Sequence, residues 1–149
     1  KEVLDQRVFP VGRLDKDTTG LLFLTNDGQF AHSMISPRYS VEKVYHVSYQ
    51  GDLRHDAESL FEQGIRLDDG TVRLPARLER TGIDQCIVTV TEGKYHQVKR
   101  MLASRGAPVI YLKRLQIGAL RLDPALAPGE WREMTQEEVQ LLEQETDNG

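Results

Sequence analysis

A charged segment that leads directly into an apolar run limits how this chain can fold more than any other feature of its sequence. Residues 11–28 read VGRLDKDTTGLLFLTNDG. The apolar run at 21–24 ends at the turn signal Asn26-Asp27-Gly28, a pattern typical of a buried strand. Four charged residues stand within positions 13–17, at the edge of that strand. Because charges at a core edge are stable only when they are paired, the fold must bring partners to this turn.

The remaining strand and helix patterns follow one another irregularly. Strands are expected over residues 21–25, 43–51, 76–81, 85–93, 109–122 and 129–135. Helices are expected over residues 28–36, 56–65, 95–108 and 135–145, the last with a capping box formed by Thr135 and Glu138. Segments 76–81 and 85–93 are expected to pair, and segment 109–122 to form a strand pair or one bent strand. Without regular βαβ spacing, the order predicts an α+β fold with a mostly antiparallel mixed sheet and flanking helices.

Composition places the chain among globular proteins of one domain, with 149 residues, 39% hydrophobic and 28% charged. No apolar run has the length of a membrane span. The single cysteine, Cys86, excludes an internal disulfide and any site built from several cysteines. It is expected to be a small buried side chain, which fits a reducing cytoplasm.

The charges are unevenly distributed, although the formal net charge is only −4. Residues 128–149 contain seven acidic residues and one basic residue. Residues 94–114 contain no acid and six basic residues: Lys94, Lys99, Arg100, Arg105, Lys113 and Arg114. This basic stretch is either a phosphate-binding surface or a solvated helix face, and composition alone does not decide between them.

Asp15 is the most unusual of the charged residues before the apolar run. A metal pair of Asp15 and Asp17 lacks a nearby His or Glu to complete its coordination. The four histidines have no metal-ligand spacing, and the sequence contains neither a nucleophile elbow nor a phosphate-binding glycine loop. A solvated turn explains Asp17 but not Asp15, which follows Leu14 at the core edge. Paired with a cation from the Lys99–Arg100 region, Asp15 could serve as a nucleophile or base acting on a nucleotide.

Four segments, in order along the chain, resemble motifs of one enzyme family. They are GRLDKDTTGLLFLTNDG at 12–28, EKVYHV at 42–47, EGKYHQVKRML at 92–102 and LAPGEWREMTQEE at 126–138. Together they resemble the RsuA/RluB/RluE/RluF group of pseudouridine synthases. ISPRYSVEKVYHV and AESLFEQGIRL are most similar to the members of that group that act on small-subunit ribosomal RNA. Large-subunit members tend to differ around Ser36-Pro37-Arg38.

The resemblance implies isomerisation of uridine to pseudouridine after the base is flipped out, with no cofactor and no metal. It implies that Asp15 attacks the sugar or removes its C2′ proton, and the sequence does not choose between these. It implies that Tyr45 stacks on the base and is a candidate for removing the C5 proton. Lys99 is expected to pair with Asp15, with the adjacent Arg100 as the alternative. The expected substrate-binding residues are Arg13, Lys43, Arg100, Arg105, Lys113 and Arg114.

The expected substrate is uridine 516 of 16S rRNA, free or in a small-subunit assembly intermediate. Alternatives are a large-subunit (23S) synthase of the same group, a noncatalytic RNA-binding module, or a metal-dependent nuclease that uses Asp15 and Asp17. Residues 1–149 are expected to form the catalytic domain. In the group, an S4-like RNA-binding domain and a first core strand precede the GRLD motif, and residues 1–149 are expected to lack both. The protein is expected to be a cytoplasmic monomer without membrane contact.

Overall fold

The structure of the chain, a computed structural model, describes residues 7–93 and 96–147. The strands are β1 (Phe9–Pro10), β2 (Thr18–Gly20), β3 (Leu24–Thr25), β4 (Lys43–Tyr49), β5 (Arg77–Gly82), β6 (Gln85–Val90), β7 (Val109–Ile117) and β8 (Leu120–Arg121). The helices are α1 (Gly28–Ile35), α2 (Ala57–Gln63), α3 (Gln97–Ser104) and α4 (Gln136–Asp147), with a 3₁₀ turn, η1, at Pro37–Tyr39. Within the described ranges, no helix is long and apolar enough to cross a membrane.

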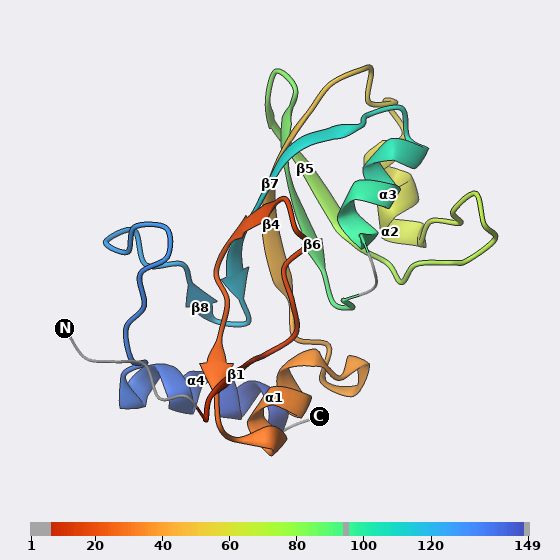
Figure 1. The fold of residues 1–149 in the computed structure, drawn as a ribbon. Coiled ribbons are helices and arrows are strands. Elements are labelled where there is room, and N and C mark those ends of the chain that lie inside the picture. Colours follow the sequence, from red (N-terminus) through yellow and green to blue (C-terminus); the bar gives the residue numbers. More distant parts are fainter. Residues whose placement is uncertain (1–6, 94–95, 148–149) are drawn as a thin grey trace.

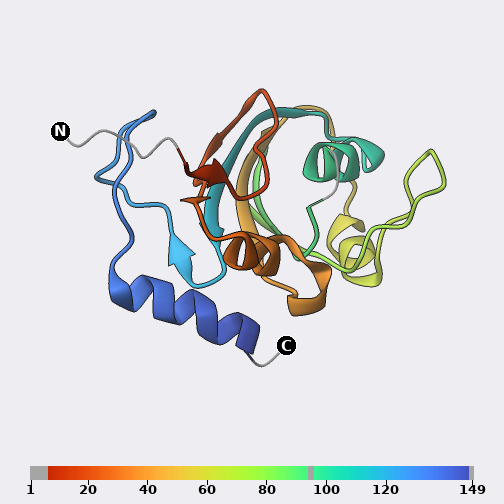
Figure 2. The same ribbon diagram turned by 60° about the horizontal axis from the view of Figure 1, so that its bottom comes forward.

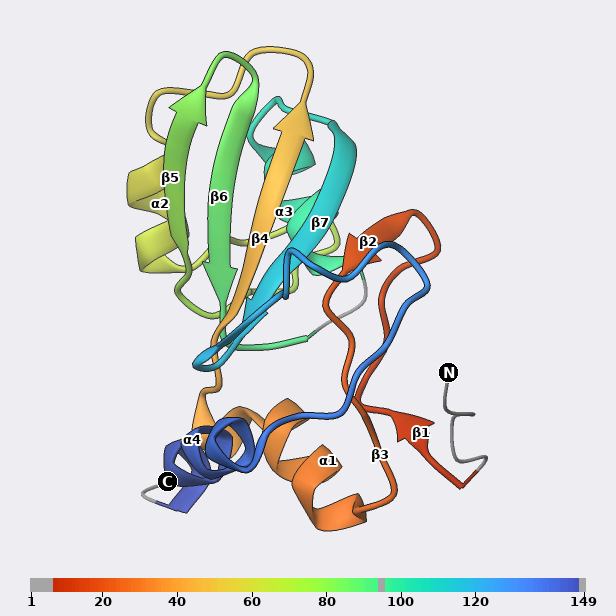
Figure 3. The same ribbon diagram turned by 90° about the vertical axis from the view of Figure 1, so that its left-hand side faces the viewer.

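A six-stranded sheet occupies the centre of the molecule, in the order β2-β7-β4-β6-β5, with β8 paired to β7. Its strand pairs are antiparallel except for β2 with β7, which is parallel. Helices α2 and α3 cover one face of the sheet (Figures 1 and 3). Helices α1 and α4 lie side by side beyond one end of it (Figure 2). This arrangement confirms the predicted α+β class with a mostly antiparallel sheet.

Two hydrophobic clusters hold these elements together. The larger lies between the sheet and helices α2 and α3, and its fully buried members include Val47, Phe61, Cys86, Val88, Met101 and Leu102. The buried position predicted for Cys86 is thus confirmed. The smaller cluster joins the segment before β2 to α1, α4 and the end of β7 through Val11, Phe23, Met34, Ile117 and Leu142. The chain therefore has two apolar centres, and the charged turn at residues 13–17 follows the first residue of the smaller one.

The strand predicted over residues 21–25 is only partly correct. Strand β2 ends before it at Gly20, and only Leu24 and Thr25 form a strand, β3, which pairs with β1. The Leu21 N–H donates the last hydrogen bond of this segment to β7, to the Arg114 carbonyl at 2.9 Å, and the following residues turn away from β7. Phe23 is buried, whereas Leu22 and Leu24 are each 37% exposed. The apolar run therefore continues from the edge strand of the sheet, and among residues 7–93 and 96–147 no layer covers the side of the run that carries Leu22 and Leu24.

The strand predicted over residues 129–135 is wrong, since this segment is irregular. Side-chain hydrogen bonds hold it instead. The Arg132 guanidinium donates to Asp123 Oδ2 at 2.8 Å, to the Glu133 carbonyl at 2.9 Å and to Glu138 Oε2 at 2.8 Å. One arginine thereby fixes the approach to α4 without a neighbouring strand.

The capping box predicted at the start of the last helix is confirmed. Glu138 N–H donates to Thr135 Oγ1 at 3.1 Å, and Thr135 N–H donates to Glu138 Oε1 at 2.9 Å. The Arg132 guanidinium and, after it, the Thr135 N–H lower the pKa of the Glu138 carboxyl from 4.5 to about 2. The Glu138 carboxylate therefore stabilises both ends of the junction between the irregular segment and α4.

Glu138→Gln should reduce the free energy of unfolding by about 1 kcal/mol at pH 7, because it removes a charge-assisted pair at the surface. A carboxyl group whose pKa is lowered by folding contributes stability above its unfolded pKa and loses that contribution as pH falls through the folded pKa. The difference between parent and variant should therefore be constant above about pH 5 and shrink between pH 4.5 and 2. Urea unfolding across this range measures it, with Glu137→Gln as the matched control. A difference that grew towards pH 2 would contradict the assignment.

Candidate active site

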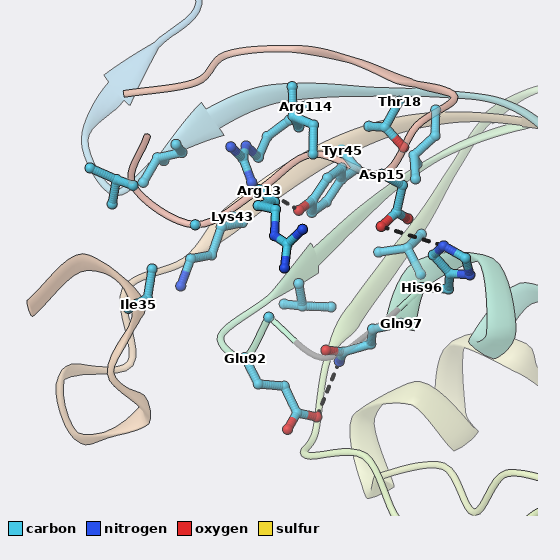
Figure 4. Close-up of a pocket in the computed structure, with 18 of the residues that line it drawn as sticks. Arg13, Asp15, Thr18, Ile35, Lys43, Tyr45, Glu92, His96, Gln97 and Arg114 are labelled. Atoms are coloured by element: carbon cyan, nitrogen blue, oxygen red, sulfur yellow. Dashed lines mark hydrogen bonds and ion pairs between the residues drawn. The ribbon is translucent and has the colours of Figure 1, made fainter. Parts of the chain in front are cut away.

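Side chains of β4 form part of the candidate pocket, because successive residues of this strand point to opposite faces of the sheet. Lys43, Tyr45 and Val47 point to the face that α2 and α3 cover, because alternate residues of a strand share a face. Arg114 of β7 lies opposite Tyr45 in the antiparallel register and points to the same face. Of these side chains, Lys43, Tyr45 and Arg114 line a cavity of about 730 Å³ (Figure 4). The cavity lies where the two hydrophobic clusters meet, since Val11, Met34 and Ile117 line it together with Val90, Val98 and Leu112.

Gly20 allows the charged turn to reach this cavity. Its φ is +116°, and a Cβ at this position would overlap the backbone of Arg114, with the Arg114 nitrogen 2.5 Å away. Only glycine tolerates both constraints. It lets β2 lie directly against β7, which places the preceding residues Arg13, Asp15 and Thr18 along the cavity wall. The glycine of the TTG sequence thus has a geometric role in positioning the site.

Asp15 stands between two basic groups at this wall. Its Oδ2 lies 3.9 Å from Lys99 Nζ, and its Oδ1 lies 3.8 Å from His96 Nε2 (Figure 4 shows the second pair). The ion pair expected between Asp15 and Lys99, 84 positions apart, is therefore present. Lys99 also lies 3.9 Å from Asp17 Oδ2, whose side chain is 81% exposed. The Asp15 side chain is 25% exposed, which keeps the carboxylate reachable from the cavity.

Arg100, the alternative partner of Asp15, points elsewhere. Its Nη2 donates to Asp69 Oδ2 at 2.5 Å on the loop after α2. This bond and two hydrogen bonds from Thr71 hold the pKa of Asp69 well below its usual range. Of the two adjacent cations, the structure pairs Lys99, and not Arg100, with Asp15.

The basic stretch does not form one surface. Arg114 is in the cavity, whereas Lys113 points to the opposite face of β7, beside His46 of β4. Arg105 lies at the far end of α3, outside the cavity lining. Lys94 lies outside the described residues. The expected substrate-binding residues that share the cavity are therefore Arg13, Lys43 and Arg114.

Two of these cations are buried on the cavity floor. Lys43 and Arg114 are each only 6% exposed. Arg114 Nε donates to the Leu21 carbonyl at 2.9 Å, and its Nη1 donates to the Tyr45 hydroxyl at 3.5 Å. Lys43 Nζ and Arg114 Nη2 have no hydrogen-bond partner among the described residues. Burial, reinforced by the nearby Arg114 charge, lowers the pKa of Lys43 from 10.5 to about 8.

Three further polar residues of the site are not among the site residues that the sequence predicts. His96 contacts Asp15 and precedes α3 in a left-handed conformation with φ of 48°. Glu92 and Gln97 are buried in the cavity wall, where Glu92 Oε1 accepts from Gln97 Nε2 at 3.1 Å and from the Leu74 N–H at 2.7 Å. All three belong to the EGKYHQVKRML segment, but one histidine, one carboxylate and one amide at these positions form no pattern that points to Asp15.

Comparison with known proteins identifies the family. The profile described as RNA pseudouridylate synthase matches residues 1–104. The chain belongs to the RNA pseudouridylate synthase family. A pseudouridylate synthase crystal structure with 40% sequence identity superimposes with a TM-score of 0.87, covering 91% of this chain and 60% of that one. The family's fold extends to an archaeal box H/ACA Nop10–Cbf5 complex, with a TM-score of 0.56 at 20% identity.

Relatives within the family include two kinds of curated protein. An uncharacterized RNA pseudouridine synthase, YtzG of Bacillus subtilis, is 49% identical over 90% of this chain and 58% of its own length. Ribosomal small subunit pseudouridine synthase A of Vibrio cholerae is 46% identical over 93% of this chain and 60% of its own length. The protein of that name from Escherichia coli is 43% identical, over 89% and 58%. The chain thus spans about 60% of the length of these family members.

Proposed function

We propose that this chain is the catalytic domain of an enzyme that isomerises uridine to pseudouridine in RNA. The observation that carries the proposal is Asp15, held between Lys99 and His96 at the wall of a cavity with Tyr45 on its floor. A cavity of about 730 Å³ is large enough for one nucleotide flipped out of its stack. Family membership supports the same reaction.

In the proposed mechanism, the Asp15 carboxylate either attacks C1′ of the sugar or removes the C2′ proton, and the C1′–N1 bond breaks. The base departs with the electron pair of that bond and turns within the cavity, and its C5 then forms a bond to C1′. This step displaces the Asp15 carboxylate from C1′ in the first route and is accompanied by return of the proton to C2′ in the second. Loss of the C5 proton and protonation of N1 complete an isomer of the substrate, so no cofactor or metal enters the balance. Arg13, exposed at the cavity, is proposed to support the flipped nucleotide through its phosphate.

We further propose small-subunit ribosomal RNA as the substrate, with uridine 516 of 16S rRNA as the target. The curated relatives named for the small subunit support this choice. A cytoplasmic location and a monomeric state stay predictions of the sequence. The test is incubation with 16S and 23S rRNA transcripts, followed by carbodiimide treatment and primer extension. A single new stop at position 516 of 16S rRNA would support the proposal, a stop in 23S rRNA alone would move the substrate to the large subunit, and no stop in either would contradict it.

Tyr45→Phe should reduce the rate of isomerisation about a hundredfold, the usual contribution of a proton-transfer group, while RNA binding stays within a few-fold of the parent. The phenyl ring still stacks on the base, but the hydroxyl that receives the Arg114 hydrogen bond is gone. Release of tritium from RNA labelled at uridine C5 measures the rate, and filter binding measures affinity. Full activity in the variant would reduce Tyr45 to a stacking platform.

A further inference from the structure

The two buried cations on the cavity floor have no counter-ion in the part of the chain that the structure describes. Lys43 and Arg114 form no ion pair with any described carboxylate, and each retains an unpartnered buried nitrogen. Glu92, the buried acid of the same cavity, is already bonded to Gln97 and to the Leu74 N–H. Burying an unpaired charge costs several kcal/mol, and here two like charges lie close together. An anionic or strongly polar ligand on this floor would offset that cost.

The depth of a cation in the cavity determines which part of a flipped nucleotide it can contact. The phosphates remain attached to the RNA chain and stay at the cavity mouth, where the exposed cations Arg13 and Lys16 can bind them. The base is the part that enters furthest. Lys43 and Arg114 share a sheet face with Tyr45, so a base stacked on the Tyr45 ring comes to lie beside both cations. The floor therefore faces the base and not the backbone.

The chemistry of uracil explains why two cationic donors are useful there. When the C1′–N1 bond breaks, the departing base carries negative charge that spreads over N1, O2 and O4. A half-turn about the N3–C6 axis exchanges N1 with C5 and exchanges O2 with O4. Two donors that bind the carbonyl oxygens before this turn therefore find carbonyl oxygens in the same places after it.

We propose that Lys43 and Arg114 form a cationic floor that binds O2 and O4 of uracil and stabilises the detached base as an anion. The inference deepens the proposed function and rests on it. Because the two charges are fixed before the substrate arrives, they interact more strongly with the anionic base than with neutral uridine, and this difference accelerates bond cleavage. Burying the two charges destabilises the free protein, and the same burial makes the site prefer the anionic base over neutral uridine.

The test compares Lys43→Met with Lys43→Arg and with Arg121→Met, which removes an exposed positive charge on β8, outside the cavity. The rate at saturating RNA should fall about a hundredfold in Lys43→Met, recover largely in Lys43→Arg and stay within twofold in Arg121→Met. The temperature of unfolding should be unchanged or higher in Lys43→Met, since a buried unpaired charge is removed. Lower activity with equal or higher stability separates a role towards substrate from a role in the fold.

Three outcomes would overturn the inference. A Lys43→Met variant within threefold of the parent rate would show that the cation does not act on the base. A variant with weaker RNA binding and a shallower salt dependence, but a normal rate at saturation, would assign Lys43 to a phosphate. A loss of activity that follows a lower unfolding temperature, and that Lys43→Arg does not restore, would make Lys43 structural. An inactive parent on every RNA tested would instead overturn the proposed function itself, and the floor's role with it.

Discussion

Replacing Asp15 by Asn should abolish pseudouridine formation, with a loss of more than roughly 10⁴-fold in rate, while RNA affinity changes by less than about threefold. The two side chains have the same shape, so the turn should keep its position at the cavity wall. The neutral amide can neither attack C1′ nor accept the C2′ proton. It also removes the charge that Lys99 and His96 face at 3.9 and 3.8 Å.

Asp17→Asn is the matched control for this experiment, because Asp17 also faces Lys99 but is 81% exposed and does not line the cavity. Its tritium release should remain within a few-fold of the parent. Gel analysis of the same reactions tests the nuclease alternative, which requires shortened RNA and inhibition by EDTA. Comparable turnover by the Asp15→Asn variant and the parent would remove Asp15 from the mechanism.

Lys99→Met should lower the rate about a thousandfold at pH 7, the upper range for loss of one preorganised charged group in a site that excludes water. When RNA fills the cavity and displaces solvent, the Asp15 carboxylate loses its hydration and needs a cation to stay ionised. His96 remains as the second basic neighbour of the carboxylate in this variant, which leaves a residual activity.

Arg100→Met provides the comparison, since it removes the same charge from the next residue of α3. Arg100 pairs with Asp69, so its loss should cost less than tenfold. Lys99→Arg should restore most of the rate, because it returns the positive charge. Single-turnover rates at saturating RNA measure all three variants. Equal losses in the Lys99 and Arg100 variants would mean that the helix acts through its overall charge and not through the contact with Asp15.

Local sequence patterns correctly predicted the elements whose conformation depends little on contacts with distant segments. Alternation gave β4 and the β5–β6 pair, and Thr135 with Glu138 gave the start of α4. The pairing of Asp15 with a cation near position 99 also followed, because a carboxylate at a core edge needs one. The strands and the helix start depend on properties that each segment carries by itself, whereas the Asp15 pairing rests on the need of one buried-edge charge for an opposite one.

The errors arose where a distant partner decides the structure. Residues 129–135 look like a strand, but the Arg132 guanidinium satisfies that segment through Asp123 and Glu138. Lys113 and Arg114 look equivalent in a basic stretch, and only the register of β7 against β4 sends them to opposite faces. The role of His96 is not visible in the sequence, since its contact with Asp15 depends on the docking of β2 against β7.

The parallel pairing of β2 with β7 joins Thr18 to Leu112, 94 positions later, and sets the order in which the protein can become active. During synthesis Asp15 is made early, but Lys99 and the strand that anchors its turn are made late. A growing chain that has not reached Arg114 carries the reactive carboxylate without a cavity. Closing so long a loop is entropically costly and slow compared with forming a local helix or hairpin. Completion of the sheet therefore completes the wall of the proposed site, and a chain that ends before Arg114 should lack that site.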